Sequence, residues 1–288
     1  MTGSKLNSIA IDCGGRLLLL DRPRIMGILN VTPDSFSDGG ECLSHKEALM
    51  HAHRMAGAGA DIIDVGGEST RPGAAAVSVQ QELDRVIPVI EAVWTETRVP
   101  ISIDSSKPEV MNAAAAAGAG MINDVYALRQ EGAMETAARL KLPVCLMHML
   151  GEPRSMQRQP QYHDVVSEVE TFLLERARDC EAAGIAKQNI LLDPGFGFGK
   201  QLEHNLELLR QLSRLSSHGY PLMVGLSRKS MLAGITGRKV AQRLAGSVTL
   251  AVLAVLAGAA IVRVHDVAQT RDAIRVLAAV WPQTPESA

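Results

Sequence analysis

The chain has 288 residues, of which 47% are hydrophobic, 21% charged and 3% aromatic, with a formal net charge of −2. This length suits two average domains or one large barrel. The near-neutral charge gives no electrostatic case for binding nucleic acid or an anionic membrane, and the scarcity of aromatic residues disfavours a base-stacking surface.

Four cysteines, Cys13, Cys42, Cys145 and Cys180, include no C-x-x-C pair. This usage is typical of reduced thiols in a cytoplasmic protein rather than of a disulfide or zinc framework. The beginning of the chain carries no long apolar segment of the secretory kind. The apolar run at 248–262 is shorter than the roughly 18 residues of a membrane span, so a buried helix leading into a buried strand explains it better.

In chain order, the sequence first predicts a small hairpin at about 9–20, with apolar stretches at 9–12 and 17–20. Eight apolar runs bounded by turn residues then predict strands at 25–29, 62–65, 99–103, 121–122, 144–147, 190–192, 222–224 and 260–264. Amphipathic or alanine-rich stretches between them predict helices at about 44–58, 78–96, 107–117, 131–141, 164–183, 202–215, 238–257 and 267–280.

Strand and helix thus alternate eight times, which predicts a parallel α/β sheet with crossover helices. The strand runs are apolar on both faces, as a sheet covered by helices requires. Eight such units favour a closed (β/α)8 barrel over an open sheet. We expect residues 1–288 to form one domain, with the hairpin capping the bottom of the barrel.

A barrel of this class carries its functional groups at the carboxyl ends of its strands. In this sequence all eight predicted strands end in polar or charged residues. The most distinctive end is 190–200, where an apolar strand runs into Asp193 and then into a loop with glycine at 195, 197 and 199. These glycines permit positive φ and a close approach to a flat ligand. The loop is not a phosphate loop, because Gln201 follows Lys200 where serine or threonine is needed.

The strand-end residues fall into two chemical sets. Asp104, Asn123 and Asp193 are acceptors and Lys229 is a donor, which together match the guanidine-amide edge of a pterin or guanine. Each charge-assisted pair contributes about 1.5–3 kcal/mol once water is excluded. The second set suits an anion such as phosphate or pyrophosphate: Thr70, Arg71, Arg228, Arg263 and His265. Asn30, Asp34 and Asp38 supply oxygens that suit Mg²⁺, which commonly bridges to phosphate.

The sequence around these residues resembles the dihydropteroate synthase family. The resemblance rests on seven segments in family order, covering about residues 24–280: NVTPDSFSDGG from Asn30, DVGGESTRPGA from Asp64, SIDSSKPEV around Asp104, IND around Asn123, DPGFGFGK from Asp193, SRKSM around Lys229 and RVHDV from Arg263. One segment alone is a weak signal, but seven in order are specific. Two departures are small: Ser105 replaces a usual threonine and Leu150 a common glutamine.

The resemblance implies a transferase of folate biosynthesis that joins dihydropterin pyrophosphate to 4-aminobenzoate and releases pyrophosphate. It implies pterin contacts from Asp104, Asn123, Asp193 and Lys229, and Mg²⁺ binding by Asn30. It also implies anion contacts from Thr70, Arg71, Arg263, Val264 and His265. The aminobenzoate wall, where sulfonamides compete in this family, is implied at Phe36, Thr70, Pro72, Phe198, Lys229 and Ser230. Of these, Asp104, Lys229, Arg263 and His265 are the candidate catalytic residues.

Two other functions remain open at this point. A pterin-binding methyltransferase would need the pterin contacts but not the pyrophosphate contacts, and a non-catalytic pterin-binding relative would not need the metal and anion residues. The apolar surfaces of the predicted helices at 238–257 and 267–280 also exceed what one barrel face needs, so we expect a homodimer.

Overall fold

The computed structural model describes residues 9–32, 40–69, 76–152, 156 and 160–281, with only the backbone described at 40–44. Within these residues, eight parallel strands close into a barrel in the order β10-β3-β4-β5-β6-β7-β8-β9. The strands are β3 (Arg24–Asn30), β4 (Ile62–Gly66), β5 (Ile101–Asp104), β6 (Met121–Asp124), β7 (Val144–Met147), β8 (Ile190–Asp193), β9 (Leu222–Val224) and β10 (Ala259–Val264). The predicted (β/α)8 barrel is confirmed.

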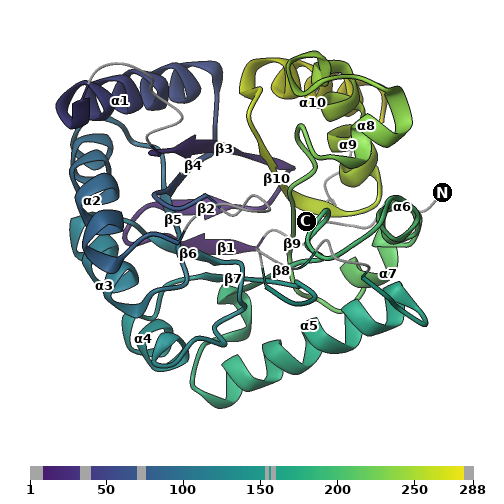
Figure 1. Ribbon diagram of the computed structural model, residues 1–288, viewed down its shortest axis with the longest axis horizontal. Helices are drawn as coiled ribbons and strands as arrows, with labels where there is room; N and C mark the ends of the chain where they lie inside the picture. The colour runs from purple at the N-terminus through teal and green to yellow at the C-terminus, as the bar shows by residue number, and fades with distance from the viewer. Residues whose placement is uncertain (1–8, 33–39, 70–75, 153–155, 157–159, 282–288) are drawn as a thin grey trace, which may run out of the picture.

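Helices surround the barrel on the outside (Figure 1). They are α1 (Gly40–Ala58), α2 (Val79–Glu96), α3 (Pro108–Ala117), α4 (Ala133–Leu140), α5 (Val165–Ala182), α6 (Leu202–Arg210), α7 (Leu212–Ser216), α8 (Met231–Thr236), α9 (Leu244–Leu256) and α10 (Val267–Val280). Their starts and stops follow the local sequence. Ser78 and Gln81 form a capping box at α2, Asp164 caps α5, and Gly118 ends α3 in the left-handed region.

Side chains along each strand alternate between the inside of the barrel and the helix layer. Met26, Ile62 and Leu191 belong to a core cluster inside the barrel, whereas Leu29 and Ile63 belong to the larger cluster that includes the helices. Alternation is the ordinary geometry of a strand. It decides which strand-end residues can meet at the barrel centre.

The predicted hairpin is formed by β1 (Ala10–Asp12) and β2 (Leu17–Leu19), which pair antiparallel. Ile11, Cys13, Leu18 and Leu20 are buried in the same cluster as the side chains inside the barrel. Gly14 and Gly120 lie against each other at the N-terminal end of β6. In Figure 1 the hairpin crosses the ring of strands, in agreement with these contacts. The hairpin therefore closes the bottom of the barrel, as predicted.

Two predicted helices were wrong in extent. The stretch 202–215 is divided at Gln211 into α6 and α7. The stretch 238–257 begins instead as a short 3-10 turn at Val240–Gln242, and α9 starts at Leu244. Arg243 explains this break, because its guanidinium donates to the carbonyl oxygens of Arg238, Arg228 and Lys229 and ties the segment to the loop after β9. The preceding helix α8 was not predicted.

Candidate active site

Inward-facing polar residues gather at the carboxyl end of the barrel. The residues of this group, which we call the pit, are Asp64, Asp104, Asn123, Asp193 and Arg263. Four of them lie two residues after an inward-facing apolar side chain of the same strand: Asp64, Asn123, Asp193 and Arg263. Asp104 occupies the equivalent position at the end of β5. The sheet register supports this arrangement, since Asp104 pairs with Asn123 across β5 and β6, and Met147 pairs with Asp193 across β7 and β8.

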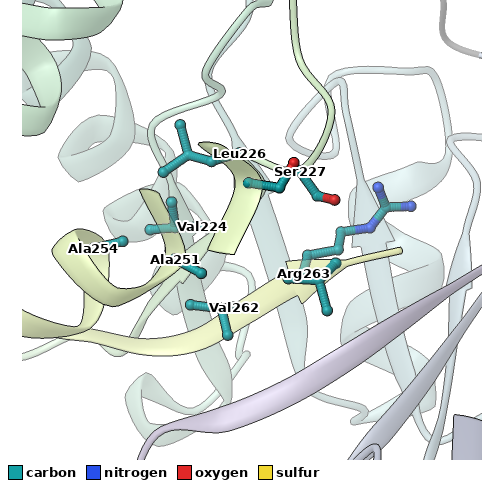
Figure 2. Close-up of a pocket in the computed structure, with 9 residues that line it drawn as sticks. Val224, Leu226, Ser227, Ala251, Ala254, Val262 and Arg263 are labelled. Atoms are coloured by element: carbon teal, nitrogen blue, oxygen red, sulfur yellow. The ribbon is translucent and has the colours of Figure 1, made fainter. Parts of the chain in front are cut away.

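Arg263 is the centre of the pit. Its Nε donates to Asp64 Oδ2 and its Nη2 donates to Asp104 Oδ2, both at 2.6 Å. Asn123 Nδ2 donates to the same Asp64 oxygen at 3.1 Å. Figure 2 shows Arg263 leaving β10 on the side away from α9, whereas Val224 and Val262 face Ala251 and Ala254 of that helix. One guanidinium therefore links β10 to β4 and β5.

Burial changes the protonation of the charged groups around Arg263. It raises the pKa of Asp104 to about 7, although the Arg263 guanidinium acts to lower that pKa, and the charge of Asp64 adds to the rise. Burial also lowers the pKa of Lys229 to about 8, with Arg263 acting in the same direction and Asp193 and Asp104 opposing it. Both groups thus change charge within one unit or so of neutral pH, which is typical of functional sites.

Asp193 ends β8, and Phe198 lies in the loop that follows. Asp193 is buried, and its Oδ1 accepts a 2.8 Å hydrogen bond from the Gly195 N–H. Phe198 packs with Met147, Met149 and Met156, and the Lys229 Nζ lies 4.0 Å from the centre of its ring. An ammonium over an aromatic face is attracted by the ring quadrupole. This contact holds the lysine beside the acidic side of the pit.

His265 follows β10 and lies beside the pit. Its Nδ1 is 3.0 Å from Ser227 Oγ. Burial and the neighbouring Arg228 and Arg263 charges together lower the pKa of His265 to about 4. The imidazole is therefore neutral at pH 7 in this state of the protein. It offers a hydrogen bond rather than the positive charge that the sequence suggested.

Several predicted residues have other surroundings. Val264 is buried in the core cluster shared with the helices, so its side chain lies away from the pit. Ser230 is exposed at the start of α8. Arg228, grouped with the anion contacts, instead pairs with Asp266, with Nη2 to Oδ1 at 2.5 Å. The remaining predictions at Asp34, Phe36, Asp38, Thr70, Arg71 and Pro72 lie outside the described residues.

Asn30 is half-buried at the end of β3, where its register partner is Gly66 of β4. A cluster of three or more His, Cys, Asp or Glu side chains that would hold a metal by itself is absent from the described part of the chain. A single amide oxygen still fits Mg²⁺, because this ion retains several waters and takes other ligands from substrate phosphates. Asn30 therefore fits a shared site and not a metal site made by protein alone.

Sequence reasoning missed the residues that fasten the loops around the pit. Asp124 points away from the pit and accepts hydrogen bonds from Tyr126 N and Leu128 N, each at 2.8 Å, and from Ser106 Oγ. Lys107 Nζ donates to Glu68 Oε2 at 2.5 Å and also to Glu82. Because side chains alternate along β6, Asp124 faces the side opposite Asn123. This alternation is the one sequence signal that could have identified Asp124 as a residue that holds a loop.

A cavity of about 440 Å³ lies between the loops after β4, β5 and β6. It is lined by Glu68, Ser69, Asp104, Lys107, Val125 and Tyr126, among others. This volume is in the range of small-molecule sites. Asp104 lines the cavity and also binds Arg263, so it is the residue that the cavity and the pit share.

Comparison with known proteins gives a consistent result. The family described as pterin binding enzyme matches residues 26–265. The chain is 55% identical to the dihydropteroate synthase of Escherichia coli K12 over 265 residues, which are 92% of this chain and 94% of that protein. Two solved structures from Xanthomonas albilineans are also similar. The dihydropteroate synthase with 4-aminobenzoic acid has a TM-score of 0.92 at 55% identity, covering 97% of this chain and 100% of that one. The dihydropteroate synthase with 7,8-dihydropteroate has a TM-score of 0.88 at 53% identity, covering 96% and 100%.

Proposed function

This chain belongs to the dihydropteroate synthase family of transferases, and we propose that the pit around Arg263 is where it joins a dihydropterin pyrophosphate to 4-aminobenzoate. The observation that carries the proposal is the convergence of Asp104, Asn123, Asp193 and Arg263 at one barrel end. The membership of the family argues against the methyltransferase and the non-catalytic alternatives.

The acceptors of the pit suit the donor edge of the pterin ring. Asp193 uses Oδ1 for the Gly195 N–H and has Oδ2 left for the ring amino group and its adjacent N–H. Asn123 donates to Asp64, which directs its amide oxygen toward a ligand donor. Lys229 is positioned to donate to the pterin carbonyl from above Phe198. Charge-assisted bonds of this kind select a ring with that pattern of donors and acceptors.

The leaving group requires positive charge and hydrogen-bond donors. Arg263 Nη1 takes no part in the bonds to Asp64 and Asp104, so in the proposal this nitrogen donates to a pyrophosphate oxygen. Neutral His265 donates one N–H. We propose that Mg²⁺ is held by Asn30 together with substrate oxygens, and that it neutralises charge on pyrophosphate when bound. Thr70 and Arg71 remain proposed anion contacts.

The reaction is a largely dissociative substitution in this proposal. The bond from the pterin methylene carbon to the pyrophosphate oxygen breaks, and its electron pair leaves with pyrophosphate. The carbon becomes cationic and conjugated to the ring, and the arylamine nitrogen then forms the new bond and loses a proton. The Asp104 carboxylate stabilises the cation through its negative charge. No protein nucleophile is needed.

The aminobenzoate is proposed to lie against Phe198 and Lys229, with Phe36, Thr70, Pro72 and Ser230 completing its wall. Competition by sulfonamides at this wall stays a prediction.

The described part of the chain includes no helix long and apolar enough to cross a membrane. The buried free thiols of Cys13, Cys145 and Cys180 support the proposed cytoplasmic location, and we propose that residues 1–288 act as one domain.

Replacing Asp104 or Lys229 tests the roles of the pit. We expect Asp104→Ala and Lys229→Ala each to lower kcat/KM for dihydropteroate formation by at least about a hundredfold, or ~2.7 kcal/mol, because each removes a charge that contacts the pterin. The exposed residues Asp84 and Lys187 provide matched controls as Asp84→Ala and Lys187→Ala. A pit variant with near-normal turnover would exclude that residue from the reaction.

The pKa values of Asp104 and Lys229 predict a bell-shaped pH profile for kcat/KM. As pH falls below about 7, Asp104 gains a proton and loses the charge that stabilises the cation. As pH rises above about 8, Lys229 loses its proton and its charge. Steady-state assays from pH 5.5 to 9.5 should give limbs near these values, since kcat/KM reports groups of the free enzyme.

Two variants assign the limbs of this profile. Asp104→Asn should abolish the acidic limb of its residual activity, and Lys229→Arg should move the alkaline limb upward because arginine keeps its charge. A flat wild-type profile between pH 6 and 9 would contradict the assignment.

Removal of Mg²⁺ tests the role of Asn30. Treatment with EDTA should abolish pyrophosphate release, and added Mg²⁺ should restore it. Asn30→Ala should raise the Mg²⁺ concentration that gives half-maximal activity, because the protein then contributes one oxygen fewer. Full activity in metal-free buffer is the result that rules out the metal.

We also propose a homodimer through the outer faces of α9 and α10. These helices pack side by side and expose large apolar side chains: Leu244, Leu253, Leu256, Val276, Val280 and Trp281. Exposed apolar surface of this kind commonly marks an interface. Sedimentation equilibrium should give a dimer that Leu256→Asp dissociates. Leu17→Asp, on the exposed side of the hairpin, is the control, and a wild-type monomer at micromolar concentration would refute the interface.

A further inference from the structure

Lys200 is a buried lysine with no assigned role in the site described above. The residue is 3% exposed, and its ammonium group is surrounded by acceptors from two loops. Nζ lies 2.9 Å from His148 Nδ1, 2.9 Å from the Gly195 carbonyl oxygen and 3.1 Å from that of Phe198, with the His148 carbonyl oxygen at 3.4 Å. A buried charge is costly unless it is hydrogen-bonded, and these neutral acceptors supply the bonds.

The protonation of the two partners is consistent with this geometry. Burial and the nearby Lys200 charge together lower the pKa of His148 to about 2. The ring is thus neutral, and its Nδ1 accepts from Lys200. Burial lowers the pKa of Lys200 to about 7, with Asp193 opposing this change and Lys229 adding to it. The ammonium form can donate to all three of its nearest partners, and the neutral amine to two of them.

Two glycines let the loop after β8 pack closely against the loop after β7. Gly195 has φ +66°, and a Cβ built on it would lie 1.9 Å from the His148 carbonyl oxygen. Gly199 has φ +62°, and its Cβ would lie 2.5 Å from the Leu150 carbonyl oxygen. The loop after β8 therefore packs directly on the loop after β7. Lys200 bonds to carbonyl oxygens of both loops, and Tyr162 Oη adds a 2.8 Å hydrogen bond from the loop after β7 to the Gly199 carbonyl oxygen.

The same loop supports two side chains of the proposed site, Asp193 and Lys229. The Gly195 peptide donates to Asp193 Oδ1 at 2.8 Å, so the position of Gly195 determines the orientation of that carboxylate. The Phe198 ring supports the Lys229 ammonium at 4.0 Å. Lys200 binds the carbonyl oxygens of both Gly195 and Phe198. Lys200 therefore binds the loop residues that contact Asp193 and Lys229, the side chains proposed to contact the substrates.

We propose that Lys200 is a positioning residue for the transfer reaction: it joins the loops after β7 and β8 and thereby orients Asp193 and the neighbouring Phe198–Lys229 pair. This inference rests on the proposed function of the pit. Lys200 touches no substrate in the proposal. It acts through the main chain of the glycine loop.

Lys200→Met tests the inference, since methionine has a similar length and cannot donate. We expect the dissociation constant of dihydropterin pyrophosphate, measured by calorimetry without aminobenzoate, to rise at least about tenfold. We expect kcat/KM for dihydropteroate formation to fall by about 10- to 100-fold, the cost of a misplacement of about 1 Å. Lys200→Gln keeps an N–H donor and should give smaller losses, and it supplies the same comparison if the methionine variant does not fold.

Ile90→Ala separates positioning from loss of stability. Ile90 is fully buried in α2, and its truncation lowers the melting temperature without touching the pit. We expect this variant to keep wild-type pterin binding at temperatures where it is folded. Lys200 variants that also lose thermal stability but keep wild-type binding and kcat/KM would overturn the inference.

A double-mutant cycle locates the effect at Asp193. In an Asp193→Asn background, Lys200→Met should weaken pterin binding by less than about threefold, because the carboxylate that Lys200 orients is already altered. Equal losses in both backgrounds would contradict action through Asp193. Failure of the proposed function is a separate result, since the wild-type protein would then make no dihydropteroate from the two substrates.

Discussion

The ion-paired hydrogen-bond network of Arg263 is the interaction on which the functional end of this barrel depends. Isolated charges are expensive to bury, and breaking one partner of a buried pair typically costs about 3–5 kcal/mol. Here one guanidinium donates to the fully buried Asp64 and to Asp104 at the same time, and Asn123 donates to the same Asp64 oxygen, Oδ2. Among the described residues, Asp64 Oδ1 has no hydrogen-bond partner. The network therefore keeps several charged groups in a space that hydrophobic side chains would otherwise fill.

The position of this network follows from strand geometry. The apolar layer below it includes Met26, Ile62, Met121, Leu191 and Ile261, all inside the barrel. Two residues further along a strand, the next inward position is at the rim, and in β4, β6, β8 and β10 that position holds Asp64, Asn123, Asp193 and Arg263. Because the strands are parallel, these rims coincide. The apolar base and the polar pit are thus two layers of one alternating pattern.

The sequence predicted the features of the fold and site that depend on where the strands lie and which residues end them. The barrel, the hairpin and the gathering of Asp104, Asn123 and Arg263 followed from apolar runs and the residues after them. Other features depend on contacts between segments that are distant in sequence. Lys200 bonds to main-chain oxygens of two loops, and such bonds produce no pattern of residue types in the sequence. The neutrality of His265 arises from burial, and the break before α9 arises from Arg243 reaching back to the loop after β9. Val264 is different, since the alternation beside Arg263 already directs it outward.

The N-terminal hairpin closes the bottom of the barrel, and this affects how substrates reach the site. Ile11 and Leu18 close the N-terminal end of the barrel, so in the described part of the chain the pit opens only toward the carboxyl ends of the strands. In the proposed arrangement, the bicyclic substrate binds in the pit, and an aromatic amine bound on the loop side of it would block its entry. That arrangement requires the pterin substrate to bind before the amine.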